Sequence, residues 1–406
     1  MRTFLALAAL LLPIAGWCQG HAWTFSELLQ QSLASHPNVL AKRASAAAAE
    51  SDHDSALWQR FPTPSLQTIS GAGLATATGN LSRFQLQQPL WTGGRITAAI
   101  DATQFRKNAA DSVVNETRQD LSLRVVAAYV EASRQQWREE QGRRGVEEHR
   151  RLLGLIDRRV RQEVNASVDR ELAQSRLYQA INDLSLNTQQ RQSALTQLSQ
   201  LTGRPVTSIV ALDPSVLAVP KSEDLALEQA IAASPTLARI AEEERAAGAD
   251  VDSKRSVLWP QVGVRFERDF GGLSDSRVML VLEAQPGAGL SAGTDISAAR
   301  SRQRAVEFSR EGALRDVQER IGVDWNELRH ARERKDNAEL SRKTSERVFE
   351  SFTQQFTTGR KSWIDVMNAV REFTQAEFAL SDASAQYIGA ALRLGIVTGT
   401  FQAAGP

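Results

Sequence analysis

The side chains that could do chemistry are few and form no catalytic pattern. The five histidines, at positions 21, 36, 53, 149 and 330, lack the spacing of metal ligands. Neither a nucleophilic triad nor a phosphate-binding glycine loop is present. No other arrangement of these side chains points to a reaction, so we expect no enzyme, metal site or cofactor.

The overall charge argues against a protein that binds polyanions. The 406 residues contain 48 Lys and Arg against 47 Asp and Glu, a formal net charge of +1. A nucleic-acid binder usually gathers a basic excess on one face. No nucleic acid is therefore expected as a partner.

Residues 1–22 have the pattern of a secretory signal peptide that is removed. A basic residue precedes the apolar stretch 4–14, and Gly20-His21-Ala22 resembles a cleavage site. That stretch is too short to cross a bilayer, and no later stretch reaches about 18 apolar residues. Cys18, the only cysteine, follows Trp17 rather than a small residue, so cleavage is favoured over a lipid anchor. An exported chain without a membrane helix is expected to be soluble or part of a β-barrel.

The rest of the chain contains an internal duplication. Four short landmarks recur at nearly the same offset. Pro37 recurs as Pro235 and Pro62 as Pro260, both 198 positions later. Asp169 recurs as Asp365 and Thr202-Gly203 as Thr398-Gly399, both 196 positions later. A constant offset of this length indicates two tandem structural repeats. The predicted divisions are a first repeat at 23–203, a connector at 204–222, a second repeat at 223–399 and a tail at 400–406.

Each repeat begins with the same expected elements. An amphipathic helix, 24–60 or 223–258, ends before a proline, which cannot continue it. Two segments that alternate apolar and polar residues follow, as is typical of strands in a membrane hairpin. We expect these strands at about 65–75 and 82–91 in the first repeat and at about 261–268 and 276–285 in the second.

Each repeat then continues into a helix too long for an ordinary globular domain. The long helices are expected at about 94–163 and 292–357, which lack proline. Roughly seventy helical residues span about 105 Å, a length typical of coiled-coil rods. Shorter return helices are expected at about 167–202 and 363–398. Their apolar residues recur in steps of four and three, which favours antiparallel packing against the long helices.

Four strands are too few to close a membrane barrel, because the smallest known barrels use about eight. If the hairpins enter a membrane, the chain must therefore assemble with copies of itself. Three copies would supply twelve strands.

The duplicated plan resembles the TolC family of outer-membrane efflux and secretion channels over essentially the whole mature chain. The family's strand-to-helix junction is similar to residues 88–95, through Pro89, Trp91, Gly93, Gly94 and Arg95. The family's helix–turn–helix tip is similar to residues 359–367, through Gly359, Ser362 and Trp363. Each motif alone is weak, but together, in order and duplicated, they are specific.

The resemblance implies a mainly α fold with a membrane β-barrel contribution. Three copies would form a twelve-stranded barrel in the outer membrane of a Gram-negative bacterium and a helical coiled-coil tunnel through the periplasm. Implied partners are a periplasmic adaptor, an inner-membrane ABC or RND transporter, and outer-membrane lipid. Such ducts export drugs or unfolded protein and perform no chemistry.

The resemblance also implies roles for residues at the tip. Asp169 and Lys361 occupy latch positions, and Asp365 occupies that of an acidic ring at the entrance. Asn368 stands where a second acidic ring often lies, and Phe356 where a hydrogen-bonding tyrosine is found. Because lysine lacks the two-pronged contact of arginine, we expect a weaker latch, and with one ring a reduced cation preference. As an alternative, Asp169 and Asp365 only cap the return helices.

Two tryptophans have alternative interpretations. Trp91 is expected to anchor the chain at the membrane edge and Trp363 to contact an adaptor, with core packing as the alternative for both.

Among functions, type I protein secretion is favoured over multidrug efflux. The reason is that the sequence around Cys18 does not favour lipidation, whereas many efflux relatives carry a lipidated cysteine. A different class, an exported coiled-coil adaptor or structural protein, stays open. Against it, the chain has no lipoyl-like segment between its helix arms.

Overall fold

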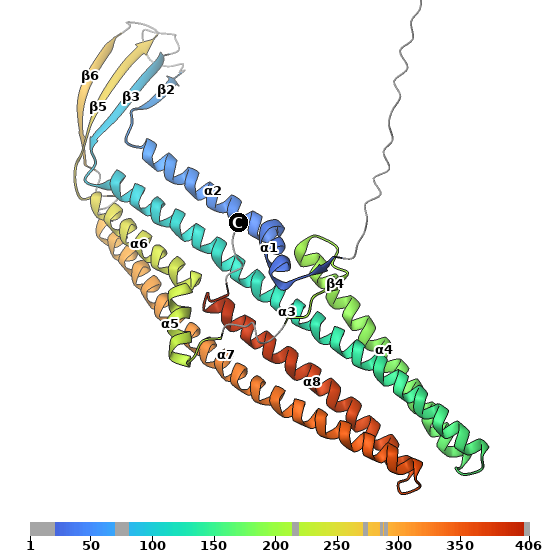
Figure 1. Ribbon diagram of the computed structural model, residues 1–406. Helices are drawn as coiled ribbons and strands as arrows, with labels where there is room; N and C mark the ends of the chain where they lie inside the picture. Colours follow the sequence, from blue (N-terminus) through green and yellow to red (C-terminus); the bar gives the residue numbers. More distant parts are fainter. Residues whose placement is uncertain are drawn as a thin grey trace, which may run out of the picture.

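The protein is long and narrow, with a small sheet at one end and two helical hairpins at the other (Figure 1). This computed structural model describes residues 21–69, 81–212, 219–270, 275–284, 287 and 291–401. Several expectations fall outside the described residues: the leader up to residue 20, positions 70–75 of the first strand, residue 285, positions 213–218 of the connector and the tail after residue 401.

The element order repeats, which confirms the predicted duplication. The first repeat contains α1 (Phe25–Ser35), α2 (Pro37–Trp58), β2 (Thr63–Ile69), β3 (Leu81–Trp91), α3 (Arg95–Arg161) and α4 (Ser167–Thr202). The second contains α5 (Glu223–Ala233), α6 (Pro235–Ser256), β5 (Gln261–Phe270), β6 (Ser276–Glu283), α7 (Ala292–Thr357) and α8 (Trp363–Val397). Two short strands, β1 (Ala22–Trp23) and β4 (Ser208–Ile209), pair in parallel beside α1.

Each repeat opens with two helices, so the expectation of a single helix at 24–60 or 223–258 is wrong. The residue before Pro37 and the residue before Pro235 are extended, with ψ angles of 128° and 112°. A proline ring clashes with a helical residue immediately before it. Each proline then occupies the first turn of the next helix, where its missing N–H is no loss. The same residue therefore ends one helix and begins another.

The four longer strands form one antiparallel sheet in the order β2-β3-β5-β6. Each repeat contributes one hairpin, and the two hairpins join along β3 and β5. Strand β2 begins at Thr63, two residues before the expected start. Strands β2 and β6 lie at the two edges, and each has one strand neighbour in the described part of the chain.

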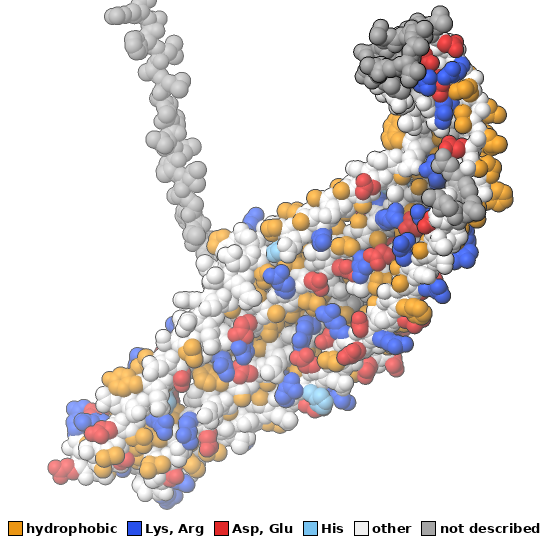
Figure 2. Space-filling model, turned by 180° about the vertical axis from the view of Figure 1, so that it is seen from behind, with side chains coloured by type: hydrophobic (Ala, Val, Ile, Leu, Met, Phe, Trp, Pro, Cys, Tyr) orange, Lys and Arg blue, Asp and Glu red, His pale blue; other side chains and the backbone are white. Residues whose placement is uncertain are grey.

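The two faces of the sheet differ because successive side chains point in opposite directions. One face carries Leu66 of β2 and three residues of β6, Val278, Leu280 and Leu282, which are 70–72% exposed. Figure 2 shows hydrophobic side chains along this margin of the sheet. The opposite face carries ion pairs between strands, including Arg83 Nε to Asp269 Oδ1 and Arg277 Nη2 to Glu267 Oε2, both 2.7 Å.

In the half of the rod away from the sheet, four helices lie in the order α4, α3, α8, α7 (Figure 1). In the half nearer the sheet, α2 packs on α3, and α6 packs on α3 and α7. Helices α3 and α4 form one hairpin, α7 and α8 the other, and α3 packs on α8 between them. The residues on the predicted return-helix seams face inward, with Leu198 of α4 and Val366 of α8 fully buried. None of the described helices combines the length and apolar composition needed to cross a membrane.

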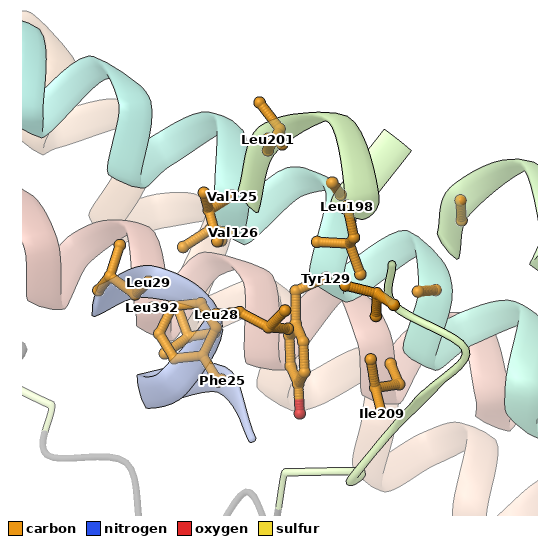
Figure 3. Close-up of a cluster of buried hydrophobic side chains, with 14 of the residues drawn as sticks. Phe25, Leu28, Leu29, Val125, Val126, Tyr129, Leu198, Leu201, Ile209 and Leu392 are labelled. Carbon is orange, nitrogen blue, oxygen red and sulfur yellow. The ribbon is translucent and has the colours of Figure 1, made fainter. Parts of the chain in front are cut away.

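The largest buried cluster ties the two repeats together midway along the molecule (Figure 3). We call it the equatorial cluster; its larger members are Phe25, Leu28, Leu29, Val125, Val126, Tyr129, Leu198, Leu201, Ile209, Ile388 and Leu392. Tyr129 is fully buried, and its hydroxyl donates a hydrogen bond of 2.7 Å to the carbonyl of Val210. Burial raises the pKa of Tyr129 to about 12.

Candidate functional site

The first tip turn connects α3 and α4 through a short network of polar side chains. Glu163 has a positive φ of 59°, and the chain reverses there. Arg159 Nε donates to Asn165 Oδ1 at 2.8 Å, and Asn165 Nδ2 donates to Asp169 Oδ2 at 3.0 Å. Asp169 lies in the first turn of α4, but the residue at the helix start provides no side-chain cap. Asp169 is therefore held in place from the preceding turn.

The second tip turn connects α7 and α8 and is closed by backbone geometry. Gly359 has a φ of 76°, a left-handed conformation that glycine adopts without strain. Ser362 and Asp365 form a reciprocal cap: the Ser362 hydroxyl accepts from the N–H of Asp365, and the carboxylate accepts from the N–H of Ser362 at 3.1 Å. These hydrogen bonds from Ser362, aided by nearby Lys361, lower the pKa of Asp365. The cap that sequence analysis offered as an alternative is thus present at Asp365.

Aromatic residues of the second hairpin form a buried core at the tip. Phe356 and Trp363 are each 3% exposed, and their ring centroids are 5.1 Å apart. Trp363 therefore packs in the core, and the expectation that it contacts an adaptor is wrong for this buried side chain. Its neighbour Ile364 is 58% exposed.

The predicted latch pair is not in contact within one chain. Lys361 Nζ lies 4.2 Å from the centre of the Phe352 ring, and the hydrogen-bond partner of Asp169 is Asn165. Asn368 is exposed and lies one turn beyond Asp365 on α8.

Sequence analysis missed Arg159, which joins the two hairpins. Its guanidinium carbon lies 4.6 Å from the centre of the Phe356 ring, a cation–π contact between α3 and α7. Arg159 is one of three arginines in the last turn of α3. Basic side chains are common at this position in any helix, because they interact favourably with the partial negative charge at the C-terminal end. No spacing rule separates Arg159 from Arg158 and Arg161, so only the fold identifies it.

The strand-to-helix junction depends on two glycines with positive φ, Gly93 at 61° and Gly94 at 89°. A Cβ at Gly93 would lie 2.8 Å from Cβ of Trp259, which follows α6 in the other repeat. The ladder between β3 and β5 shifts register between Pro89 and Trp91. Trp91 is 47% exposed and meets Trp259 edge to face at 6.4 Å. Arg95, half-buried, begins α3 immediately after the turn.

Residues 28–204, most of the first repeat, match the sequence model of the family described as outer membrane efflux protein. This part of the chain is therefore similar to the outer membrane efflux protein family. The second repeat has the same order of helices and strands as the matched first repeat. No curated protein matches the chain significantly.

Solved structures similar to this chain share its fold over nearly the whole length. A membrane protein from Pseudomonas aeruginosa has a TM-score of 0.79 at 17% identity, with 92% of this chain and 93% of that chain covered. The outer membrane protein VceC of Vibrio cholerae has a TM-score of 0.78 at 15% identity, with 92% and 96% covered. The MtrE outer membrane channel of Neisseria gonorrhoeae has a TM-score of 0.73 at 14% identity, with 92% and 88% covered.

The matched family is made up of channel proteins rather than enzymes. Among the described residues, no group of three or more His, Cys, Asp or Glu is placed to hold a metal ion.

Proposed function

We propose that the chain is the outer-membrane duct of a three-part export system. It would receive cargo from an inner-membrane ABC or RND transporter and its periplasmic adaptor and conduct it across the periplasm and the outer membrane. The observation that carries the proposal is the sheet with one apolar and one charged face, continuous with a helical rod. Apolar outside and polar inside is the pattern of a channel wall in lipid.

The proposed assembly is a homotrimer. Edge strands with unpaired N–H and C=O groups favour pairing with another chain, and β2 and β6 offer such edges. The outer helices of the rod also carry exposed apolar side chains, namely Val168, Tyr178 and Leu186 on α4 and Phe308, Val323 and Leu340 on α7. Packing α4 of one copy against α7 of the next would cover both sets. Three copies then give the twelve strands that closure requires.

The tip is the proposed entrance. Three copies of Asp365 would form one acidic ring, and Lys361 of one copy would face Asp169 of the next as the latch. Asn368 would add a polar but uncharged ring. With Trp363 buried, the exposed apolar residues Val164 and Ile364 are the proposed contacts for the adaptor.

Type I protein secretion is the proposed cargo class. Its support is the sequence around Cys18, where Trp17 does not favour lipidation. Drug efflux is the second candidate, favoured by the match to a family described as efflux proteins. Co-purification with the inner-membrane transporter decides between the two cargo classes. An ABC transporter with a protein substrate supports secretion, whereas an RND transporter supports efflux.

The duct itself is tested by reconstituting the purified protein in planar bilayers. We expect stable conductance steps from a species that migrates as a trimer on gels before heating and as a monomer afterwards. An exported coiled-coil adaptor would instead stay soluble and give no conductance. That result would remove the proposed function.

Replacing Asp365 by asparagine should reduce the cation preference of the channel. Asparagine keeps an oxygen that can accept from the N–H of Ser362, so the helix cap is largely preserved while the charge is lost. An ion about 4 Å from one carboxylate gains roughly 1 kcal/mol even at the dielectric constant of water, so we expect a drop of about fivefold in the cation-to-anion permeability ratio.

The matched control is Glu372→Gln, which removes a charge from the exposed surface of the same helix, away from the turn. Reversal potentials in a salt gradient measure both variants. Equal selectivity in Asp365→Asn and the unchanged protein would assign Asp365 to capping alone.

A further inference from the structure

A pocket of about 390 Å³ lies between α3, α4 and α8, part of the way from the equatorial cluster to the tip. Its size falls in the usual range for small-ligand sites, roughly 300–1,000 Å³. Gly142 and Gly145 form part of its α3 side. A Cβ at these positions would meet its nearest neighbours, Leu184 Cδ1 and Thr374 Cγ2, at 3.4 and 3.9 Å, which are ordinary contacts. Packing therefore does not require glycine there, and the two residues leave open space.

Two buried polar side chains face this space. His149 of α3 and Asn187 of α4 line the pocket and are 8% and 4% exposed. The Asn187 amide nitrogen lies 3.6 Å from where a Cβ of Gly142 would be. Within the described part of the chain, neither side chain has a hydrogen-bond partner. Because buried polar groups are normally paired, the pocket presents two groups that an occupant can satisfy.

Burial lowers the pKa of His149, and the charge of nearby Arg176 lowers it further. The imidazole is therefore neutral at pH 7. A neutral imidazole offers one N–H donor and adds no charge of its own.

The lining of the pocket is basic. It contains three arginines and one carboxylate, namely Arg138, Arg176, Arg371 and Asp183. Arg138 is already neutralised, because its Nη2 lies 2.7 Å from Asp382 Oδ2. Arg176 and Arg371 form no ion pair with any described residue, and their hydrogen bonds go to amide oxygens at 2.7 and 3.5 Å. Two guanidinium groups without a carboxylate favour an oxyanion, which each can hold through two parallel hydrogen bonds.

A neighbouring pocket between α3, α7 and α8 shows the opposite arrangement. Its arginines have carboxylate partners within the chain. Arg342 Nη1 lies 3.1 Å from Glu346 Oε2, and Arg144 Nη2 lies 3.3 Å from Glu140 Oε1. Unpaired arginines are thus a property of the first pocket and not of the rod in general.

The α8 side of the first pocket continues the helix face that carries Asn368. Arg371 and Gln375 follow Asn368 by three and seven positions, a spacing that places side chains on one face of a helix. All three are exposed, and Arg371 Nη2 lies 3.5 Å from Asn368 Oδ1. In the proposed duct Asn368 forms a ring at the entrance, so the pocket would open into the passage just behind it.

We propose that this pocket binds an oxyanion, the phosphate or carboxylate group of a small solute in the passage. Arg371 and Arg176 supply the positive charge, while His149 and Asn187 supply uncharged donors at the buried end. The source of the solute rests on the proposed duct function, whereas the site itself does not. Three copies of the chain would place three such sites behind the acidic ring of Asp365, so solutes would meet opposite charges in turn.

Calorimetric titration of the purified protein in detergent with inorganic pyrophosphate tests the site directly. We expect saturable binding of one pyrophosphate per chain. Arg371→Gln and Arg176→Gln should each raise the dissociation constant by about tenfold or more, the effect of losing one charge-assisted hydrogen bond.

The matched control is Arg150→Gln, which removes an exposed charge next to His149 from outside the pocket lining. We expect it to bind pyrophosphate as tightly as the unchanged protein does. No binding to the unchanged protein, or equal weakening in all three variants, would overturn the site.

A fourth variant, Asn187→Leu, separates a role in binding from a role in folding. Leucine has a similar size and removes a buried polar group that lacks a partner among the described residues, so the melting temperature should stay equal or rise. Pyrophosphate binding should nevertheless weaken about fivefold, as for one neutral hydrogen bond. Unchanged binding would overturn the placement of the anion at the buried end.

Conductance of the reconstituted channel tests whether the site faces the passage. Pyrophosphate added on the side of the tip should reduce the open current reversibly, and Arg371→Gln should abolish most of that reduction. Binding in calorimetry without any change in current would overturn the placement in the passage. A protein that gives no conductance even without pyrophosphate would instead remove the duct function, while calorimetry still decides the anion site.

Discussion

Replacing Tyr129 by alanine is expected to lower the free energy of unfolding by about 3–5 kcal/mol, the range for truncating a large aromatic side chain in a core. Tyr129 is 0% exposed and lies in the equatorial cluster, with its ring 5.1 Å from that of Phe25. Truncation would leave a cavity between both repeats, because α1, α3 and α8 meet there (Figure 3). Urea denaturation of the purified protein in detergent, at one fixed protein concentration, measures the change.

Two control variants separate the contributions to this effect. Tyr129→Phe keeps the ring and removes the hydroxyl that donates to the carbonyl of Val210, so we expect a loss of about 1–3 kcal/mol from the unpaired carbonyl. Phe61→Ala truncates another aromatic side chain, one that is 54% exposed. A loss at Tyr129→Ala no larger than at Tyr129→Phe would contradict the assignment of Tyr129 to the core.

Much of the fold could be predicted from periodicity. The long helices and the return helices emerge within about two residues of their expected bounds because no proline or glycine cluster interrupts them. The strands were recognisable because one face is apolar and the other polar, which enforces a period of two. The duplication needed no structural knowledge, since landmark residues such as Pro37 and Pro235 keep a constant offset.

Other features could not be predicted because they depend on contacts between distant segments. The helix break at Pro37 was ambiguous in sequence, since proline is tolerated in the first turn of a helix as well as after its end. Arg159 and Phe356 are 197 positions apart, and nothing in either residue's neighbours indicates their contact. Similarly, the choice between burial and exposure at Trp363 and Ile364 depends on the direction of the turn before them.

The tip illustrates how a residue-by-residue comparison can mislead. Lysine at 361 and phenylalanine at 356 lack the hydrogen-bonding groups that the family resemblance implies at these positions, and a weaker latch was the natural expectation. In the structure both residues are engaged in cation–π contacts, Lys361 with Phe352 and Phe356 with Arg159. Phe356 has no hydroxyl for a hydrogen bond, but the face of its buried ring still binds the cation of Arg159.

Replacing Gly93 by alanine is expected to be far more damaging than the same change at its neighbour Gly94. Both residues have positive φ, so each alanine meets backbone strain of about 1–2 kcal/mol. At Gly93 the new Cβ would also lie 2.8 Å from Trp259 Cβ and 3.0 Å from the carbonyl oxygen of Ser256. Relieving such overpacking typically costs a further 1–3 kcal/mol or so. At Gly94 a Cβ would meet nothing within 4 Å.

The pair of alanine variants thus isolates packing from backbone strain within one turn. Thermal melting of the purified protein in detergent should place Gly94→Ala a little below the unchanged protein, because of the backbone strain, and Gly93→Ala further below it. Because Gly93 is where β3 turns into α3 against the end of α6, the strain falls on the contact between the two repeats at the base of the sheet. Equal melting temperatures for the two alanine variants would mean that Trp259 can move aside freely. The two glycines of the junction would then be required by the turn geometry alone.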